Sequence, residues 1–106
     1  MKPSELTGQK LDRIVHDLAH PEEPIKDGCL APDYSSDWCF GGPIIEREGI
    51  ELCRLESSSF GIEWRGQIDC DCRYYGSTPL IAAMRCFVAS KLGGDIEIPQ
   101  EFEVTA

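Results

Sequence analysis

The 106-residue sequence predicts a single compact α+β domain in which two helices pack on a small, mainly antiparallel sheet. Three observations predict this class. Residues 6–19 carry apolar side chains at helical spacing, residues 78–92 form an almost wholly apolar helix, and residues 50–68 have the pattern of two strands joined by a turn. A chain this short builds one small core, so we treat residues 1–106 as one domain.

The first expected helix covers Leu6 to Ala19, and its apolar face consists of Leu11, Ile14, Val15 and Leu18. Ser4 and Thr7 are both suitable N-caps, because a hydroxyl oxygen can accept a hydrogen bond from a free N–H of the first turn. Pro21 and Pro24 follow closely and predict the end of this helix.

The middle of the chain predicts a β-hairpin formed by residues 50–56 and 60–68, with three serines at the turn. The second strand alternates: one expected face holds Phe60, Ile62, Trp64 and Ile68, and the other holds Glu63, Arg65 and Gln67. This period of two indicates a strand with one buried face. The tail from Asp95 to Val104 also alternates, which favours a further short edge strand.

The last helix, residues 78–92, is the element with the clearest boundaries. Thr78 is the expected N-cap, Pro79 occupies the first helical position and Gly93 follows the last turn. Its residues are apolar on every side, and Arg85 is its only charge before Lys91, so this helix is expected to run through the core.

The charge balance limits the classes of partner. The chain has 10 Lys and Arg residues against 19 Asp and Glu residues, a formal net charge of -9, which excludes non-specific nucleic-acid binding. No apolar run approaches the roughly 18 residues of a membrane span, and the first ten residues lack the apolar stretch of a signal peptide. We therefore expect a cytoplasmic protein with no membrane contact, whose six cysteines are reduced thiols.

Two patterns resemble metal sites, and we reject both. His16 and His20 have the spacing of the zinc motif H-E-x-x-H, but Asp17 replaces the glutamate and no third ligand lies at a suitable distance in the sequence. Cys70 and Cys72 are separated by one residue, whereas zinc turns use two to four. The sequence therefore predicts no metal ion and no other cofactor.

The candidate ligand site lies between residues 34 and 46. Gly41 and Gly42 precede a short helix expected over residues 43–48, and free N–H groups at a helix start attract anions. The aromatic and polar residues beside them could bind a flat base and ribose hydroxyls, or Trp38 could instead fill the core. The candidate residues are Tyr34, Ser35, Ser36, Asp37, Trp38, Gly41 and Gly42, with Arg85 as a further charge. The alternative for Arg85 is an ion pair with a carboxylate such as Glu46.

No nucleophile motif, phosphate-binding loop or dinucleotide fingerprint occurs in the sequence, so we expect a protein that is not an enzyme.

Three blocks of sequence resemble the NinX family of small proteins from lambdoid and related tailed phages. They are residues 4–12, residues 37–48 with Asp37-Trp38 and Gly41-Gly42-Pro43, and residues 76–93. The family pattern lacks the histidines at 16 and 20 and the cysteines at 70 and 72. The resemblance implies a phage accessory protein of the host bacterial cytoplasm, and it implies no catalytic residue and no cofactor.

Two functions are compatible with these observations. One is a non-catalytic small-molecule binder, such as a sponge for a nucleotide immune signal of the cyclic dinucleotide or cyclic ADP-ribose type. The other is an acidic inhibitor that binds a host or defence protein, which accounts for the net charge of -9 without a pocket. A homo-oligomer with a site between subunits is compatible with either, and both functions rest on analogy with other phage accessory proteins.

Overall fold

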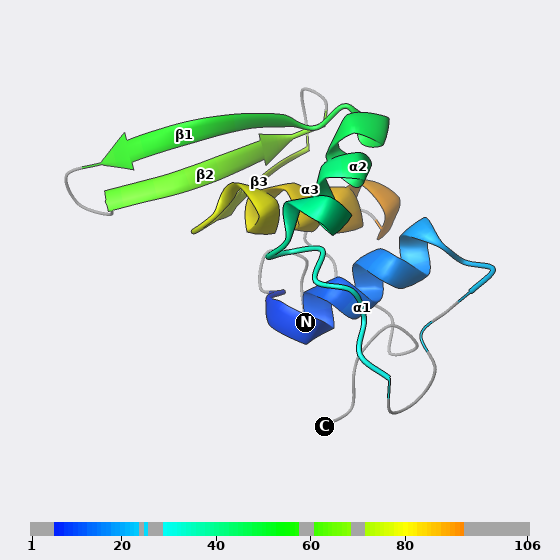
Figure 1. The fold of residues 1–106 in the computed structure, drawn as a ribbon. Helices are drawn as coiled ribbons and strands as arrows, with labels where there is room; N and C mark the ends of the chain where they lie inside the picture. The colour runs from blue at the N-terminus through cyan, green and yellow to red at the C-terminus, as the bar shows by residue number, and fades with distance from the viewer. Residues whose placement is uncertain (1–5, 24, 26–28, 58–60, 69–71, 93–106) are drawn as a thin grey trace.

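The computed structural model describes residues 6–23, 25, 29–57, 61–68 and 72–92, which form three helices and three strands. In chain order these are α1 (Gly8–Ala19), α2 (Trp38–Glu48), β1 (Glu51–Ser57), β2 (Gly61–Gln67), β3 (Arg73–Gly76) and α3 (Pro79–Leu92). The sheet lies on one side of α3 and α1 lies on the other (Figure 1). The predicted α+β class is confirmed, with α1 layered on α3.

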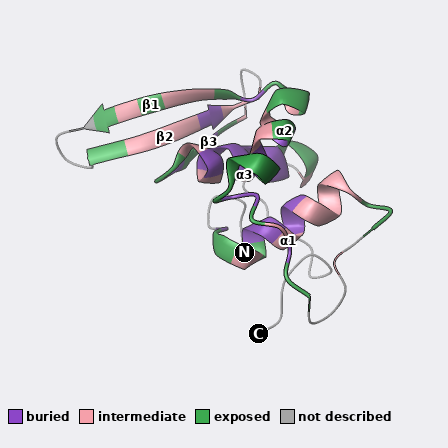
Figure 2. Cartoon of the chain, viewed as in Figure 1, coloured by how far each residue is buried: buried purple, intermediate pink, exposed green. Residues whose placement is uncertain are grey.

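The helix α3 is the centre of the core, because it contacts all three strands as well as α1 and α2. Its buried residues are Leu80, Ala82, Ala83, Met84, Cys86, Phe87, Val88 and Ala89 (Figure 2). The hydroxyl oxygen of Thr78 accepts a hydrogen bond from the backbone N–H of Ile81 at 3.2 Å, which confirms the predicted N-cap. The expected stop at Gly93 lies outside the described residues.

The sheet has the strand order β1-β2-β3, and both neighbouring pairs are antiparallel. Pairing of β1 with β2 runs from Glu51 opposite Gln67 to Ser57 opposite Gly61, which confirms the predicted hairpin. The strand β3 was not predicted, because a four-residue strand is too short to show a period. The edge strand predicted over residues 95–104 lies outside the described residues.

The predicted buried face of β2 is only partly correct. Ile62 is 51% exposed, because the turn end of the hairpin extends beyond α3 (Figure 1); Phe60 lies outside the described residues. Near the other end of β2 the contact with α3 is very close. A Cβ atom on Gly66 would lie 2.8 Å from the carbonyl oxygen of Ala82, and one on Gly76 would lie 2.8 Å from the Ala82 nitrogen. Glycine at these two positions therefore lets the sheet approach the backbone of α3.

The helix α1 begins two residues later than predicted and ends at Ala19 as expected. Thr7 has the extended backbone of an N-cap, but its hydroxyl makes no capping hydrogen bond; Ser4 lies outside the described residues. Three of the four predicted apolar residues, Leu11, Ile14 and Val15, are fully buried in the core. No helix in the described part of the chain is long and apolar enough to cross a membrane.

The helix α2 starts five residues before the predicted position at Pro43. Asp37 is its N-cap, since its carboxylate accepts a hydrogen bond from the backbone N–H of Cys39 at 2.9 Å. Pro43 therefore lies inside the helix. The predicted stop is confirmed: Gly49 has φ 66° and ψ 42°, the left-handed conformation that glycine adopts without strain.

Candidate functional site

The turn that leads into α2 is fastened to α1 by a buried carboxylate. The backbone N–H of Ser35 donates to Oδ1 of Asp12 at 2.8 Å, and Asp12 is only 3% exposed. The N–H groups of Ser36 and Asp37 donate to the carbonyl oxygen of Asp33, at 3.2 and 2.8 Å. These bonds give the segment before Trp38 a defined conformation, so the position of Trp38 depends on Asp12.

Burial raises the pKa of the Asp12 carboxyl above its usual range, and the negative charge of Asp33 acts in the same direction. Hydrogen bonds from the side chain and backbone of Ser35 favour the carboxylate and offset only part of this effect. The folded protein therefore binds the Asp12 proton more tightly than the unfolded chain does. As a result, this group lowers the free energy of unfolding as the pH rises from the unfolded pKa of 3.8 through the folded pKa.

We expect Asp12→Asn to be at least as stable as the wild type at pH 7, because an amide carries no charge to desolvate and its oxygen can still accept from Ser35. The advantage should shrink as the pH falls through the raised pKa of Asp12. Asp12→Ala, the matched control, should be about 1–3 kcal/mol less stable than Asp12→Asn at every pH, because the Ser35 N–H loses its acceptor. Urea unfolding at several pH values measures both effects. An advantage of Asp12→Asn that grows toward acid pH would contradict this account.

Tyr34 belongs to the core and is absent from the pocket wall. It is 5% exposed, and its hydroxyl lies 2.9 Å from Nδ1 of His16. Nε2 of the same imidazole lies 2.8 Å from the carbonyl oxygen of Glu23, which can only accept. In the neutral imidazole, Nε2 therefore carries the proton and Nδ1 accepts from the Tyr34 hydroxyl. Burial raises the pKa of that hydroxyl.

The structure overturns the argument for anion binding at Gly41 and Gly42. Both residues lie inside α2, and the N–H of Gly41 donates to the Asp37 carbonyl oxygen at 3.0 Å. Gly41 is instead a packing position, because a Cβ atom there would lie 2.5 Å from the carbonyl oxygen of Tyr34 and 2.6 Å from Cδ2 of Leu80. Because Gly41 has no side chain, α2 can pack closely against both the preceding turn and α3.

A pocket of about 280 Å³ lies where the start of α2 faces the start of α3. It is lined by Ser35, Ser36, Trp38, Thr78, Pro79, Leu80 and Ile81. Three of these residues are in the predicted site. The other four, residues 78–81, were predicted only as the start of a helix, and nothing in their local sequence indicates that this start faces Asp37 and Trp38.

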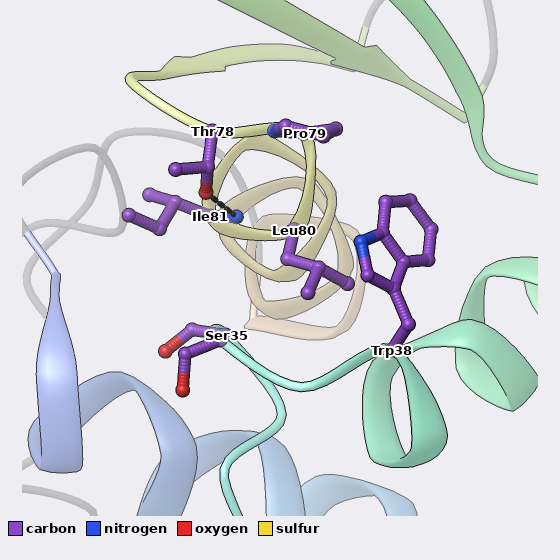
Figure 3. Close-up of a pocket in the computed structure, with 7 residues that line it drawn as sticks. Ser35, Trp38, Thr78, Pro79, Leu80 and Ile81 are labelled. Carbon is purple, nitrogen blue, oxygen red and sulfur yellow. Dashed lines mark hydrogen bonds between the residues drawn. The ribbon is translucent and has the colours of Figure 1, made fainter.

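Trp38 forms one side of this pocket, opposite Pro79 and Leu80 (Figure 3). It is 53% exposed, so about half of its surface is accessible. The alternative in which Trp38 fills the core is therefore wrong. The pocket lining combines this aromatic residue with aliphatic residues, two serines and one threonine. Such a lining suits a flat ring with polar groups at its edge.

The described residues that line the pocket are neutral. None of these seven residues is an acid, a base, a histidine or a cysteine. The hydroxyl of Thr78 is already engaged as the N-cap of α3.

Arg85 has a structural role that differs from both sequence interpretations. Its Nε donates to the carbonyl oxygen of Leu6 and its Nη1 to that of Tyr75, each at 2.7 Å. It therefore links the segment before α1 to β3 through α3, and it is not among the residues that line the pocket. Burial lowers the pKa of the guanidinium, while the charge of Glu63 acts in the opposite direction.

The residues of the two rejected metal patterns have other contacts. The rings of His16 and His20 are 5.1 Å apart, and both nitrogens of His16 are engaged as described above. Cys70 lies outside the described residues, and Cys72 contacts Cys86. Within the described ranges, no group of three or more His, Cys, Asp or Glu side chains is placed to hold a metal ion.

Comparison with known proteins gives one family. The family model described as "Bacteriophage P22, NinX" matches residues 25–91. This range includes α2, the strands β1 to β3, most of α3 and the seven described residues that line the pocket. No curated protein matches the chain. The match covers more than half of the sequence.

Proposed function

The chain belongs to the bacteriophage P22 NinX family, and from this premise we propose that it is a phage accessory protein that sequesters a nucleotide immune signal in the host cytoplasm. In this proposal the protein binds its ligand without converting it. The family assignment confirms the resemblance found in the sequence. The ligand and the host process are inferences from the pocket.

The observation that carries the proposal is the exposed indole of Trp38 in the pocket wall. A nucleobase presents a flat π-face, and stacking on an aromatic side chain contributes about 1–3 kcal/mol per base. Pro79 and Leu80 supply an apolar surface across from the indole (Figure 3). The hydroxyl of Ser36 can bond to the edge of the base or to a ribose hydroxyl.

The volume of the pocket limits what enters it. At about 280 Å³ it is at the small end of ligand pockets, which span about 300–1,000 Å³. One base fits this space, whereas the rest of a cyclic dinucleotide or cyclic ADP-ribose would lie outside. Because none of the described lining residues is a cation and the net charge is -9, we expect the phosphates to face solvent.

The test is calorimetry with a panel of cyclic dinucleotides and ADP-ribose derivatives. We expect Trp38→Ala to weaken binding by about 5- to 150-fold, the equivalent of 1–3 kcal/mol of lost stacking. Phe40→Ala is the matched control, because Phe40 is also an exposed aromatic of the first turn of α2 but does not line the pocket. It should bind as the wild type does.

The melting temperatures of both variants are measured in parallel. A wild type that binds no member of the panel would contradict the nucleotide proposal. So would equal losses of affinity in Trp38→Ala and Phe40→Ala when both variants are folded.

The second candidate function is an inhibitor that binds a basic host or defence protein. The observation that favours it is that Trp38 and Phe40 are both exposed in the first turn of α2, at 53% and 43%. Aromatic side chains are common anchors of protein interfaces, and the acidic surface would complement a basic partner. In that case both alanine variants should weaken the complex, whereas only Trp38→Ala should affect a nucleotide.

A further inference from the structure

Two cysteines that are 14 residues apart in the sequence are in contact where α3 packs against the sheet. The sulfur of Cys72, the residue before β3, lies 3.6 Å from the sulfur of Cys86 in the middle of α3. Cys86 is fully buried with Tyr74 and Ala89, while Cys72 packs at the edge of this cluster and is partly exposed. One member of the pair is therefore open to a reagent from solvent, and the other is protected behind it.

Several contacts hold the two thiols in this position. The Cys86 thiol lies 3.3 Å from the carbonyl oxygen of Cys72, and the Cys72 thiol lies 3.6 Å from the carbonyl oxygen of Cys86. The backbone of Cys72 is further restrained by the N–H of Ile68, which donates to its carbonyl oxygen at 3.1 Å. The approach of the sulfurs thus results from the packing of α3 against β2 and β3.

We propose that Cys72 and Cys86 are a modification site, at which a small-molecule disulfide such as glutathione disulfide converts the two thiols into a reversible intramolecular disulfide. The sulfurs are in contact but not bonded, and forming a bond of about 2.05 Å requires them to approach by about 1.5 Å. The inference does not depend on the ligand of the Trp38 pocket.

The reaction has two exchange steps. The partly exposed Cys72 loses its proton and attacks one sulfur of glutathione disulfide. The S–S bond of glutathione disulfide breaks and releases one glutathione, which takes up a proton. The sulfur of Cys86, after loss of its proton, then attacks the Cys72 side of the mixed disulfide and releases the second glutathione. The two protein thiols are oxidised, glutathione disulfide is reduced to two thiols, and no net proton is gained or lost.

The bond would close a loop from residue 72 to residue 86. This loop holds β3 and the first half of α3, including residues 78–81 of the pocket wall. A crosslink of this kind restricts the unfolded chain, so the oxidised protein should be the more stable form. In a reducing cytoplasm this disulfide would form only transiently, when the ratio of glutathione disulfide to glutathione rises.

The experiment treats the reduced full-length protein with glutathione disulfide, quenches with an alkylating agent and maps the peptides by mass spectrometry without reduction. Cleavage before Asp71 and after Arg85 separates Cys72 from Cys70 and releases Cys86 in its own peptide. We expect a linked pair that contains Cys72 and Cys86. The melting temperature should rise by about 10 °C and return to its starting value on reduction.

Two variants are controls. Cys72→Ser, at the partly exposed position, should fold normally and show no rise in melting temperature on oxidation. Cys39→Ser removes an exposed thiol of α2 and should respond as the wild type does. Three outcomes would each overturn the proposal. Cys72 could be recovered only as a thiol or a glutathione adduct, or Cys86 could be linked to another cysteine. The third outcome is a melting temperature that does not change after the two cysteines are linked.

Discussion

Replacing Ala83 with aspartate will unfold the protein. Ala83 has no exposed surface, and its Cα would lie only 3.2 Å from a Cβ atom on Gly66 of the adjacent strand. A carboxylate at this position would clash with the adjacent strand and would have no contact with solvent. The cost of burying an unpaired charge is several kcal/mol, which is comparable to the whole stability of about 5–15 kcal/mol expected for a small domain.

The measurement is circular dichroism with thermal melting, and the matched control is Ser90→Asp. Ser90 is an exposed residue of the same helix, so the same charge is added where water can solvate it. We expect Ser90→Asp to melt cooperatively near the wild-type temperature and Ala83→Asp to show no cooperative transition. A folded, cooperatively melting Ala83→Asp would mean that α3 is not the core helix.

Gly41→Ala is expected to destabilise the protein by about 1–3 kcal/mol, although alanine is the better helix former. The new methyl group would lie 2.5 Å from the carbonyl oxygen of Tyr34 and 2.6 Å from the side chain of Leu80. Leu80 can move, but the Tyr34 carbonyl belongs to a backbone turn that Asp12 holds in place. The turn and α2 must therefore separate, which also shifts the two sides of the pocket.

Gly42→Ala is the matched control for this prediction. Among the described residues, a Cβ atom at Gly42 meets only the Trp38 ring, at 4.0 Å, which is an ordinary contact. Because alanine favours the helix by up to about 1 kcal/mol over glycine, this variant should be as stable as the wild type or more stable. Denaturant unfolding of the two variants gives the comparison directly. Equal effects of the two substitutions would show that helix propensity, and not the contact with Tyr34, controls this position.

The start of α2 shows how a local rule can be outweighed. Proline is favoured in the first turn of a helix, and Gly41 and Gly42 are poor helix formers, so the sequence predicts a start at Pro43. In the structure the Asp37 cap and the packing of Gly41 against Tyr34 and Leu80 favour a start at Trp38. Glycine is costly for the helix, but here it allows a contact that no other residue permits.

Only part of the candidate site was predicted, because local sequence patterns do not show which distant segments pack together. A tryptophan beside serines in an aperiodic segment is a local signal, and it led to Ser35, Ser36 and Trp38, which line the pocket. The sequence also predicted Tyr34 and Arg85 as ligand-binding residues, but both have structural partners. The hydroxyl of Tyr34 meets His16, and the guanidinium of Arg85 binds the carbonyl oxygens of Leu6 and Tyr75. His16 and Leu6 are distant in the chain from the residues they bind. The partners of Arg85 are backbone carbonyl groups, which every residue has, so the identity of the residue does not reveal them.

The sequence by itself determined the helix at 79–92, its threonine cap, the hairpin and the family, because each depends on residues that are neighbours or lie at a regular spacing. Only the tertiary structure decided that α3 lies between α1 and the sheet, that two helix starts enclose a pocket, and that Cys72 meets Cys86. These features depend on distances between segments that are far apart in the chain. Such distances depend on how closely two backbones pack at glycines such as Gly41 and Gly66. A local sequence pattern does not predict this close packing.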